Sequence, residues 1–259
     1  MGTEQTTAAA EVTEAEVSPA RRAELAELLA PVRRRIAATC AAAGRGPDEV
    51  ELMAVTKTVS AGDVAALLDL GLNLLGENRV QEATHKVDAV ATLRPAAHPR
   101  WHLIGGLQRN KVRAVARWAE QVESVDSLRL ADALDLAVRR SMNTGGRESS
   151  LSVLVQYSVD GDPKRGGVPR SDLLPLAERV AGCAGLQLAG LMAVAPFGAD
   201  LESAFADIAA AAAALRAAHP EAATLSAGMS GDLEVAIRHG CDVVRVGTAL
   251  VGERTLASR

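Results

Sequence analysis

Val50-Glu51-Leu52-Met53-Ala54-Val55-Thr56-Lys57-Thr58 is the stretch that decides the fold class of this chain. Its apolar run has the length of a buried strand and stops at a lysine. An open doubly wound sheet typically has a glycine-rich dinucleotide-binding turn after its first strand, and Lys57-Thr58 stands in that place here. After this stretch, short apolar runs alternate with amphipathic segments without a break. Such alternation predicts parallel strands covered by helices.

Eight strands and seven intervening helices are predicted from Val50 onward. The strands are expected at 50–56, 73–76, 101–104, 121–125, 151–157, 186–191, 224–226 and 242–246. The helices are expected at 61–70, 79–93, 109–119, 127–142, 171–181, 201–219 and 231–239. Eight strands in one domain favour closure into a single (β/α)8 TIM barrel, and an open doubly wound sheet is the competing α/β fold.

A long helix is predicted ahead of the barrel, over residues 20–43, with Ser18-Pro19 as its N-cap and first helical residue. Pro31 is expected to kink or interrupt this helix. Residues 1–17 are rich in Thr, Glu and Ala and are predicted to form a mobile tail. The expected organisation is therefore a tail over 1–17 and one barrel domain over 18–259.

Composition argues against several classes of protein. The 259 residues carry 28 Lys and Arg against 32 Asp and Glu, a net charge of −4, which does not favour a nucleic acid partner. No run approaches the roughly 18 consecutive apolar residues of a membrane span, and the first residues lack the pattern of a secretory signal. We therefore expect a cytoplasmic protein without a membrane partner. With no evident apolar stripe for self-association, a monomer is expected.

The three cysteines, Cys40, Cys183 and Cys241, are far apart and lack the spacing of a metal site or a disulfide framework. They are expected to be reduced and mostly buried thiols.

Lys57 is the first candidate for chemistry. An amine held against apolar neighbours loses its proton more easily, which frees its lone pair to form an imine with a carbonyl compound or with pyridoxal 5′-phosphate (PLP). On local grounds alone, a solvated loop charge is the more common role of a lysine after a strand.

The loops after the last two strands are candidate phosphate sites. In a TIM barrel the carboxyl ends of the strands form the functional face, and phosphate is commonly bound after strands seven and eight. Ser226-Ala227-Gly228-Met229-Ser230-Gly231-Asp232 follows the seventh strand and Gly247-Thr248-Ala249 follows the eighth. Both loops combine glycine with hydroxyl side chains, which suits an anion. The alternative is that both are ordinary turns, in which Gly and Ser are common.

Two polar residues are expected inside predicted strands. Arg245 lies in a valine-rich strand and needs a partner there, either a ligand atom such as a PLP pyridine nitrogen or a buried acid such as Glu77. His102 lies on the third strand, where a hydrogen-bonded core histidine is favoured over a general base.

Seven short motifs occur in order between Val50 and Gly252. They are Ala54-Val55-Thr56-Lys57-Thr58, Gly76-Glu77-Asn78-Arg79-Val80-Gln81-Glu82, Trp101-His102-Leu103-Ile104-Gly105, Leu107-Gln108-Arg109-Asn110-Lys111, Gly190-Leu191-Met192-Ala193, Gly228-Met229-Ser230 and Val244-Arg245-Val246-Gly247-Thr248-Ala249. In these motifs the chain resembles the YggS/PROSC family of pyridoxal phosphate homeostasis proteins.

This resemblance implies a single barrel similar to the N-terminal domain of alanine racemase, the fold type III of PLP proteins. It implies that Lys57 forms the internal aldimine with PLP and that Arg245 faces the pyridine nitrogen. The phosphate would be held by Ser226, Gly247 and Thr248, with Asn78 and Met229 as pocket neighbours. An arginine at the ring nitrogen discourages its protonation and so weakens the electron sink.

The chain departs from the family pattern at four places. The family often has His where Gly106 stands, Lys-Ser-Gly where Lys164-Arg165-Gly166 stands, Asp at Gly231 and a second lysine at Val59. None of these changes removes an aldimine or phosphate residue, but they put in doubt any secondary PLP site or transfer route that depends on extra lysines.

Three functions are weighed. The resemblance favours a PLP-binding protein without strong catalysis of its own, which stores or delivers the cofactor, with apo PLP-dependent enzymes as candidate partners. The second domain that brings a catalytic tyrosine in alanine racemases is not expected here, and Tyr157 is the only tyrosine of the sequence. A PLP enzyme acting on amino acids and a class I aldolase using Lys57 are the alternatives, and slow racemase or transaminase side activity stays open.

Overall fold

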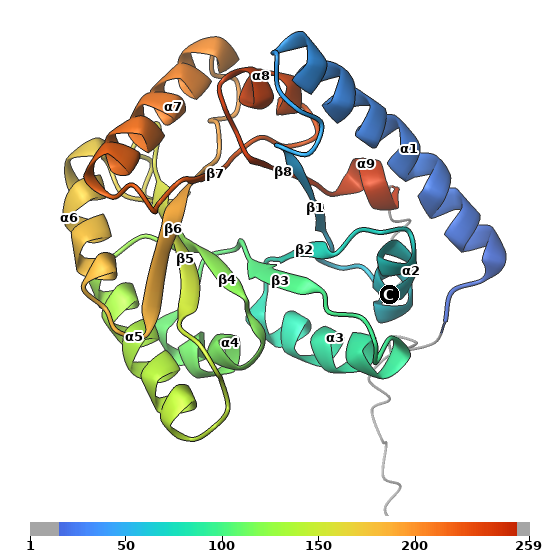
Figure 1. Ribbon diagram of the computed structural model, residues 1–259, viewed down its shortest axis with the longest axis horizontal. Helices are drawn as coiled ribbons and strands as arrows, with labels where there is room; N and C mark the ends of the chain where they lie inside the picture. The colour runs from blue at the N-terminus through green and yellow to red at the C-terminus, as the bar shows by residue number, and fades with distance from the viewer. Residues whose placement is uncertain (1–15, 253–259) are drawn as a thin grey trace, which may run out of the picture.

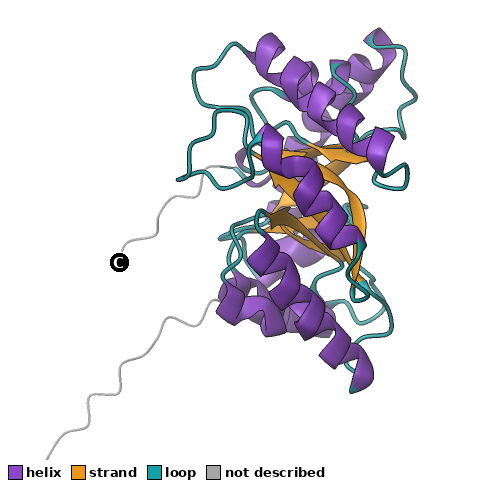
Figure 2. Ribbon diagram, turned by 90° about the vertical axis from the view of Figure 1, so that its left-hand side faces the viewer, coloured by secondary structure: helices purple, strands orange, loops and turns teal. Residues whose placement is uncertain are grey.

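The computed structural model describes residues 16–252, which form a closed barrel of eight parallel strands in the order β1 to β8 (Figure 1). The barrel closes because β1 pairs with both β2 and β8. Helices surround the barrel, and the side view shows the sheet enclosed between them (Figure 2). The predicted α/β class and (β/α)8 TIM barrel are confirmed, and the open doubly wound sheet is wrong.

The strands are β1 (Glu51–Val55), β2 (Leu74–Glu77), β3 (Arg100–Leu103), β4 (Gln121–Val125), β5 (Leu151–Tyr157), β6 (Leu186–Ala193), β7 (Thr224–Ser226) and β8 (Val243–Val246). The helices are α1 (Pro19–Ala42), α2 (Ala61–Asp69), α3 (Val80–Leu93), α4 (Val112–Trp118), α5 (Leu128–Asn143), α6 (Arg170–Ala181), α7 (Leu201–Ala218), α8 (Leu233–Arg238) and α9 (Thr248–Val251), with a 3-10 turn η1 (Arg109–Lys111) before α4.

All eight strands were predicted, and the differences lie at element ends. β6 extends two residues beyond the predicted end, to Ala193, and the predicted helix at 109–119 is divided into η1 and α4. The short helix α9, directly after β8, was not predicted, because four residues are too few to show a helical period.

Helix α1 continues through Pro31 from its N-cap Ser18, so the expected interruption is wrong. Pro31 lies on the exposed side of α1, where the carbonyl that loses its helical partner can be hydrated. The buried side of α1, which includes Leu25, Leu29 and Val32, packs on the layer formed by α2, α8 and α9. An amphipathic helix is thereby added to the outside of the barrel wall (Figure 1).

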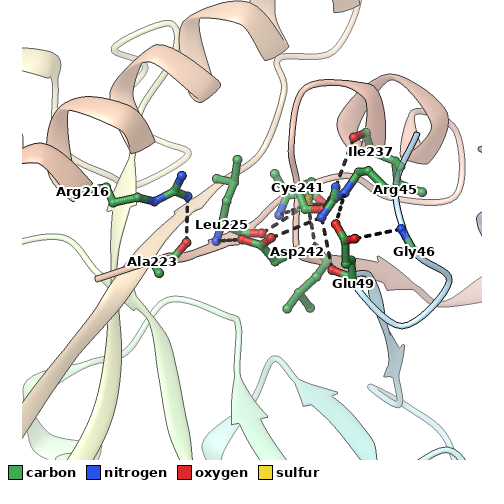
Figure 3. Close-up of polar contacts among 11 residues, drawn as sticks. Arg45, Gly46, Glu49, Arg216, Ala223, Leu225, Ile237, Cys241 and Asp242 are labelled. Atoms are coloured by element: carbon green, nitrogen blue, oxygen red, sulfur yellow. Dashed lines mark hydrogen bonds and ion pairs between the residues drawn. The ribbon is translucent and has the colours of Figure 1, made fainter. Parts of the chain in front are cut away.

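Arg45 fixes the loop between α1 and β1 to the amino end of β8 (Figure 3). Its Nη1 donates to the carbonyl oxygens of Ile237 at 3.2 Å and Cys241 at 2.6 Å, and its Nη2 donates to Asp242 Oδ1 at 3.4 Å. Oδ2 of Asp242 accepts from the amide of Leu225 in β7 at 2.8 Å. One guanidinium therefore joins the segments that meet where the barrel closes.

The main core lies between the barrel wall and the helices, and a smaller apolar cluster of Met53, Leu74 and Val243 fills part of the barrel interior. The three cysteines are free and buried, as predicted. Within residues 16–252, no helix is long and apolar enough to cross a membrane.

The predicted mobile tail falls largely on residues 1–15, outside the described part, and stays a prediction there. The last two residues of the predicted tail are described: Val17 packs against the core, and Glu16 forms an ion pair with Arg94. The domain boundaries also stay predictions.

Candidate functional site

A cavity of about 790 Å³ opens at the carboxyl ends of the strands. It is formed by the loops after β1, β2, β7 and β8, together with α1, α2 and the ends of β3 and β6. Six of the seven residues predicted for the site line it: Lys57, Asn78, Met229, Arg245, Gly247 and Thr248. The structure thus brings together residues that lie up to 191 positions apart in the sequence, from Lys57 to Thr248.

Lys57 begins the turn after β1, and its side chain is exposed within the cavity. The burial against apolar neighbours that sequence reasoning expected is therefore not present. Lys57 Nζ lies in the cavity and, among the described residues, has neither a hydrogen bond nor an ion pair. A cavity with a single unengaged primary amine can capture an aldehyde.

Side chains of α3 hold the turn that carries Lys57. Thr58 has a φ of 62°, the one positive φ of a non-glycine residue in the described chain, and its amide donates to Glu82 Oε1 at 2.5 Å. Lys86 Nζ on α3 donates to the carbonyl oxygen of Thr56 at 2.6 Å and to Glu82 Oε1 at 3.1 Å. Both neighbours of Lys57 are therefore tied to α3, which fixes the direction in which the lysine leaves the strand.

Arg245 lies at the floor of the cavity and is only 5% exposed. Its Nη1 donates to Ser226 Oγ at 2.8 Å and its Nη2 donates to the carbonyl oxygen of Ala193 at 2.8 Å. The acid near it is Glu123, whose Oε2 lies 4.0 Å from Nη1. Glu77, suggested from the sequence as its partner, instead pairs with Lys86 on the helix side of the barrel wall.

Ser226 does not line the cavity, and its role in holding phosphate stays a prediction. The side chain is fully buried, and its hydroxyl donates to Glu123 Oε2 at 2.6 Å while accepting from Arg245. Ser230, four residues later in the same loop, does line the cavity. Ser226 is the last residue of β7 and points into the barrel, whereas Ser230 lies in the turn beyond it.

The loops after β7 and β8 offer unengaged backbone donors. Among the described residues, the amides of Ser230, Gly231, Thr248 and Ala249 donate to no protein acceptor. The amides of Thr248 and Ala249 belong to the first turn of α9, where no intrahelical acceptor exists. Amides of this kind at neighbouring loop ends suit a phosphate group.

Glycines allow close approach at two positions of the site. A Cβ on Gly105 would lie 2.2 Å from the carbonyl oxygen of Asn78, so glycine lets the loop after β3 pack directly on the backbone of Asn78. Gly228 has a φ of 84°, and a Cβ there would lie 2.5 Å from that of Ala236. Asn78 is half-buried and Met229 is exposed at the rim.

His102 is a buried, hydrogen-bonded histidine inside the barrel, as favoured from the sequence. Its Nδ1 lies 2.8 Å from Glu123 Oε1. Full burial on its own raises the pKa of the Glu123 carboxyl, but the contacts with His102, Arg245 and Ser226 outweigh burial and hold that pKa below its ordinary value. Glu123 is therefore a buried carboxylate.

Sequence reasoning missed Arg21, which extends from α1 to the rim of the cavity. Its Nη2 donates to the carbonyl oxygen of Val251 at 2.8 Å, its Nε pairs with Asp63 at 3.0 Å, and its Nη1 pairs with Glu24 at 2.8 Å. No local pattern in α1 marks this arginine, because its partners are distant in the sequence. Glu123 was missed too, although a charged residue in a short apolar strand was a usable signal.

Comparisons with known proteins show the family of this chain. The family model for the alanine racemase N-terminal domain matches residues 29–255. A pyridoxal phosphate homeostasis protein of Mycobacterium tuberculosis is 44% identical over 93% of this chain and 96% of its own length. This chain belongs to the pyridoxal phosphate homeostasis protein family. The YggS/PROSC resemblance is thereby confirmed.

Solved structures of the family have the same fold. The PipY protein of Synechococcus elongatus, in its structure with PLP bound, is 32% identical and aligns with a TM-score of 0.74 over 88% of this chain and all of its own. The alanine racemase of Corynebacterium glutamicum, at 15% identity, shares the fold alone, with a TM-score of 0.64 over 90% of this chain and 62% of its own.

Proposed function

We propose that this protein binds PLP in the cavity at the carboxyl end of its barrel, holds it through Lys57, and stores or delivers it in the cytoplasm without strong catalysis of its own. The observation that carries the proposal is the convergence of Lys57, Arg245 and the loops after β7 and β8 on one cavity. PLP has an aldehyde, a pyridine nitrogen and a phosphate, and the cavity offers a partner for each.

Each part of the cofactor has a partner of suitable chemistry. The unengaged amine of Lys57 suits the aldehyde, and Arg245 supplies a fixed positive charge for the pyridine nitrogen. The amides and hydroxyls of Ser230 and Thr248, with the backbone of Gly247, suit the phosphate. PLP bound there supplies an electrophilic carbon and a conjugated ring that withdraws electrons. Membership of the family, and PLP in the PipY structure, support PLP as the ligand of this chain.

Among the described residues, the cavity has no free acid or tyrosine to serve as a second group for proton transfer opposite Lys57. Its carboxylates Glu24 and Asp63 are both engaged by Arg21. Tyr157, the one tyrosine of the sequence, does not line the cavity, and its hydroxyl donates to Asp207 at 2.6 Å. An enzyme acting on amino acids by two-base chemistry needs such a group. These contacts favour a carrier, with apo PLP-dependent enzymes as its recipients.

The experiment is visible absorbance of the purified protein after addition of PLP. We expect a yellow protein whose colour is fixed by borohydride, with the label mapped to Lys57. Lys57→Ala is expected to lose the band, whereas Lys164→Ala, which removes a lysine outside the cavity, is expected to keep it. A colourless wild-type protein that gains no band with PLP would contradict the proposal.

Assays with free amino acids test the absence of strong catalysis. The yellow protein is expected to show no rapid multiple turnover as racemase or transaminase, and to lose PLP to an apo PLP-dependent enzyme during co-incubation. Rapid turnover would instead make it a PLP enzyme. If the protein is colourless and a sugar phosphate is trapped on Lys57 by borohydride, the aldolase alternative is correct.

A further inference from the structure

The interior of the barrel contains a continuous polar chain that ends at the cofactor cavity. TIM-barrel interiors are usually filled by bulky apolar side chains. Register places Gln121 beside His102 and Ser152 beside Gln121, so these side chains share the inner face. Hydrogen bonds run from Ser152 to Gln121 at 2.8 Å, from Gln121 to Glu123 at 3.3 Å and from Ser226 to Glu123 at 2.6 Å.

Every contact of Glu123 is with a donor. Oε1 is next to His102 Nδ1 and Gln121 Nε2, and Oε2 accepts from the Ser226 hydroxyl. Ser226 has one proton and gives it to Glu123, so its lone pairs are left to accept from Arg245 Nη1. The hydrogen bonds therefore have a fixed direction, from Arg245 through Ser226 to the carboxylate.

The same contacts orient Arg245. A guanidinium has five N–H donors, and two of those of Arg245 are used by Ser226 and by the carbonyl oxygen of Ala193. These two hydrogen bonds fix the guanidinium so that its remaining N–H groups can face the cavity that Arg245 lines. A buried arginine without a compensating charge would be costly, and Glu123 is the carboxylate closest to it among the described ion pairs.

We propose that Glu123 is a positioning residue for the cofactor: through Ser226 it orients Arg245, and its negative charge offsets the positive charge that Arg245 presents to the cavity floor. The inference rests on the proposed PLP binding. His102 contacts the carboxylate at its other oxygen, with Nδ1 2.8 Å from Oε1. Glu123 does not touch the cavity, and its effect reaches the cofactor through Arg245.

We expect the charge of Glu123 to have a measurable effect on the cofactor bound at Lys57. The visible band of PLP held on a lysine depends on one proton, and it is lost as the pH rises through that group's pKa. Removal of a nearby negative charge lowers the pKa of a proton-bearing group. We therefore expect Glu123→Gln to lower the pH midpoint of the visible band by on the order of one unit.

The other titratable residues around the cavity are not substituted in Glu123→Gln. They are Arg21 and Glu24 from α1, Asp63 from α2, Lys57, His102 from β3, Asp232 from the β7–α8 loop, Cys241 before β8 and Arg245. A change of midpoint in Glu123→Gln therefore reports the carboxylate.

The experiment is a pH titration of the visible band in the PLP-loaded protein, with Glu123→Asp and Ser152→Ala beside Glu123→Gln. Glu123→Asp keeps the charge and is expected to keep the midpoint near that of wild type. Ser152→Ala removes a hydroxyl from the same polar chain without a contact to Glu123, and is expected to leave the midpoint unchanged. A purely structural role of Glu123 would change thermal stability in Glu123→Gln but not the midpoint.

Ser226→Ala provides a second test, which decides the matter if Glu123→Gln does not fold. It breaks the link between Arg245 and Glu123 but keeps both charges, so PLP affinity is expected to fall about tenfold, as for loss of a hydrogen bond between buried groups. Wild-type affinity in Ser226→Ala, or a wild-type midpoint in a folded Glu123→Gln, would overturn the inference. Failure of wild-type protein to take up PLP would instead refute the proposed function, so the two failures are distinguishable.

Discussion

The ammonium of Lys86 lies 2.7 Å from Oε1 of Glu77, in a buried pair between the barrel wall and α3. Lys86 also donates to the carbonyl oxygen of Thr56, and the Thr56 hydroxyl donates to Glu77 at 2.7 Å. Oε2 of Glu77 has no hydrogen-bond partner among the described residues. Burial is the main cause that raises the pKa of Glu77, against the opposing effect of Lys86. The pair supports the turn of Lys57 from the side opposite the cavity.

Replacing Lys86 with methionine is expected to destabilise the protein by about 3 kcal/mol, because it leaves the Glu77 carboxylate buried without a partner. The double variant Lys86→Met with Glu77→Gln is expected to recover more than half of this loss, since no buried charge is then left alone. Urea unfolding followed by circular dichroism at neutral pH measures both. If Lys86→Met unfolds at the wild-type urea midpoint, the Lys86–Glu77 pair does not stabilise the fold.

Gly105 and Gly106 form a matched pair for substitution by alanine. At Gly105 the added Cβ would lie 2.2 Å from the Asn78 carbonyl oxygen, whereas at Gly106 it would meet nothing within 4 Å. Gly105→Ala is expected to cost about 2 kcal/mol or more through overpacking, and to weaken PLP binding because Asn78 must move. Gly106→Ala is expected to stay within about 0.5 kcal/mol of wild type.

Thermal unfolding and PLP titration of the two variants check this expectation. Equal stability of Gly105→Ala and Gly106→Ala would show that the loop after β3 can move away from Asn78 without cost.

Arg45 and Arg216 provide a second matched comparison near the seam of the barrel (Figure 3). Arg45 joins the α1–β1 loop to the end of α8 and to the residues before β8. Among the described residues, Arg216 makes a single hydrogen bond, to the Ala223 carbonyl oxygen at 2.8 Å. Arg45→Met is expected to lower the free energy of unfolding by about 2 kcal/mol, and Arg216→Met by less than about 1 kcal/mol. Urea denaturation of both proteins measures the difference, and an equal loss would refute the special role of Arg45.

Acid unfolding is expected to depend on Glu123. The folded-state pKa of this carboxyl lies below its ordinary value of 4.5, so the unfolded state binds a proton more readily. Its contribution to stability is therefore complete above that value and is lost as the pH falls through the lower, folded-state pKa. Urea unfolding of wild type and Glu123→Gln from pH 7 to pH 2 checks this sign. The difference between their free energies of unfolding should become smaller only as the pH falls into the acid range. If that difference becomes larger as the pH falls, the expected sign of the Glu123 contribution is wrong.

Much of the site was predictable because it follows strand ends. Lys57 is the second residue after β1, and Gly247 and Thr248 directly follow β8. Parallel strands in a closed barrel place their carboxyl ends at one face. The sequence alone does not decide which of the Ser226 and Ser230 hydroxyls reaches the cavity, since only three residues separate them and one of these is a glycine. Which of them faces the cavity depends on where β7 ends and on the positive φ of Gly228.

The sequence by itself determined the barrel, through the spacing of eight apolar runs, and it determined the family, through motifs around Lys57 and Arg245. Only the tertiary structure decided the partners of the buried charges. Arg245 is joined to Glu123 through Ser226, and Glu77 to Lys86, because strand register sets which side chains face the interior and which face the helices. A charge in a strand reveals that a partner is needed, but the identity of that partner depends on contacts between residues as distant in sequence as Glu123 and Arg245.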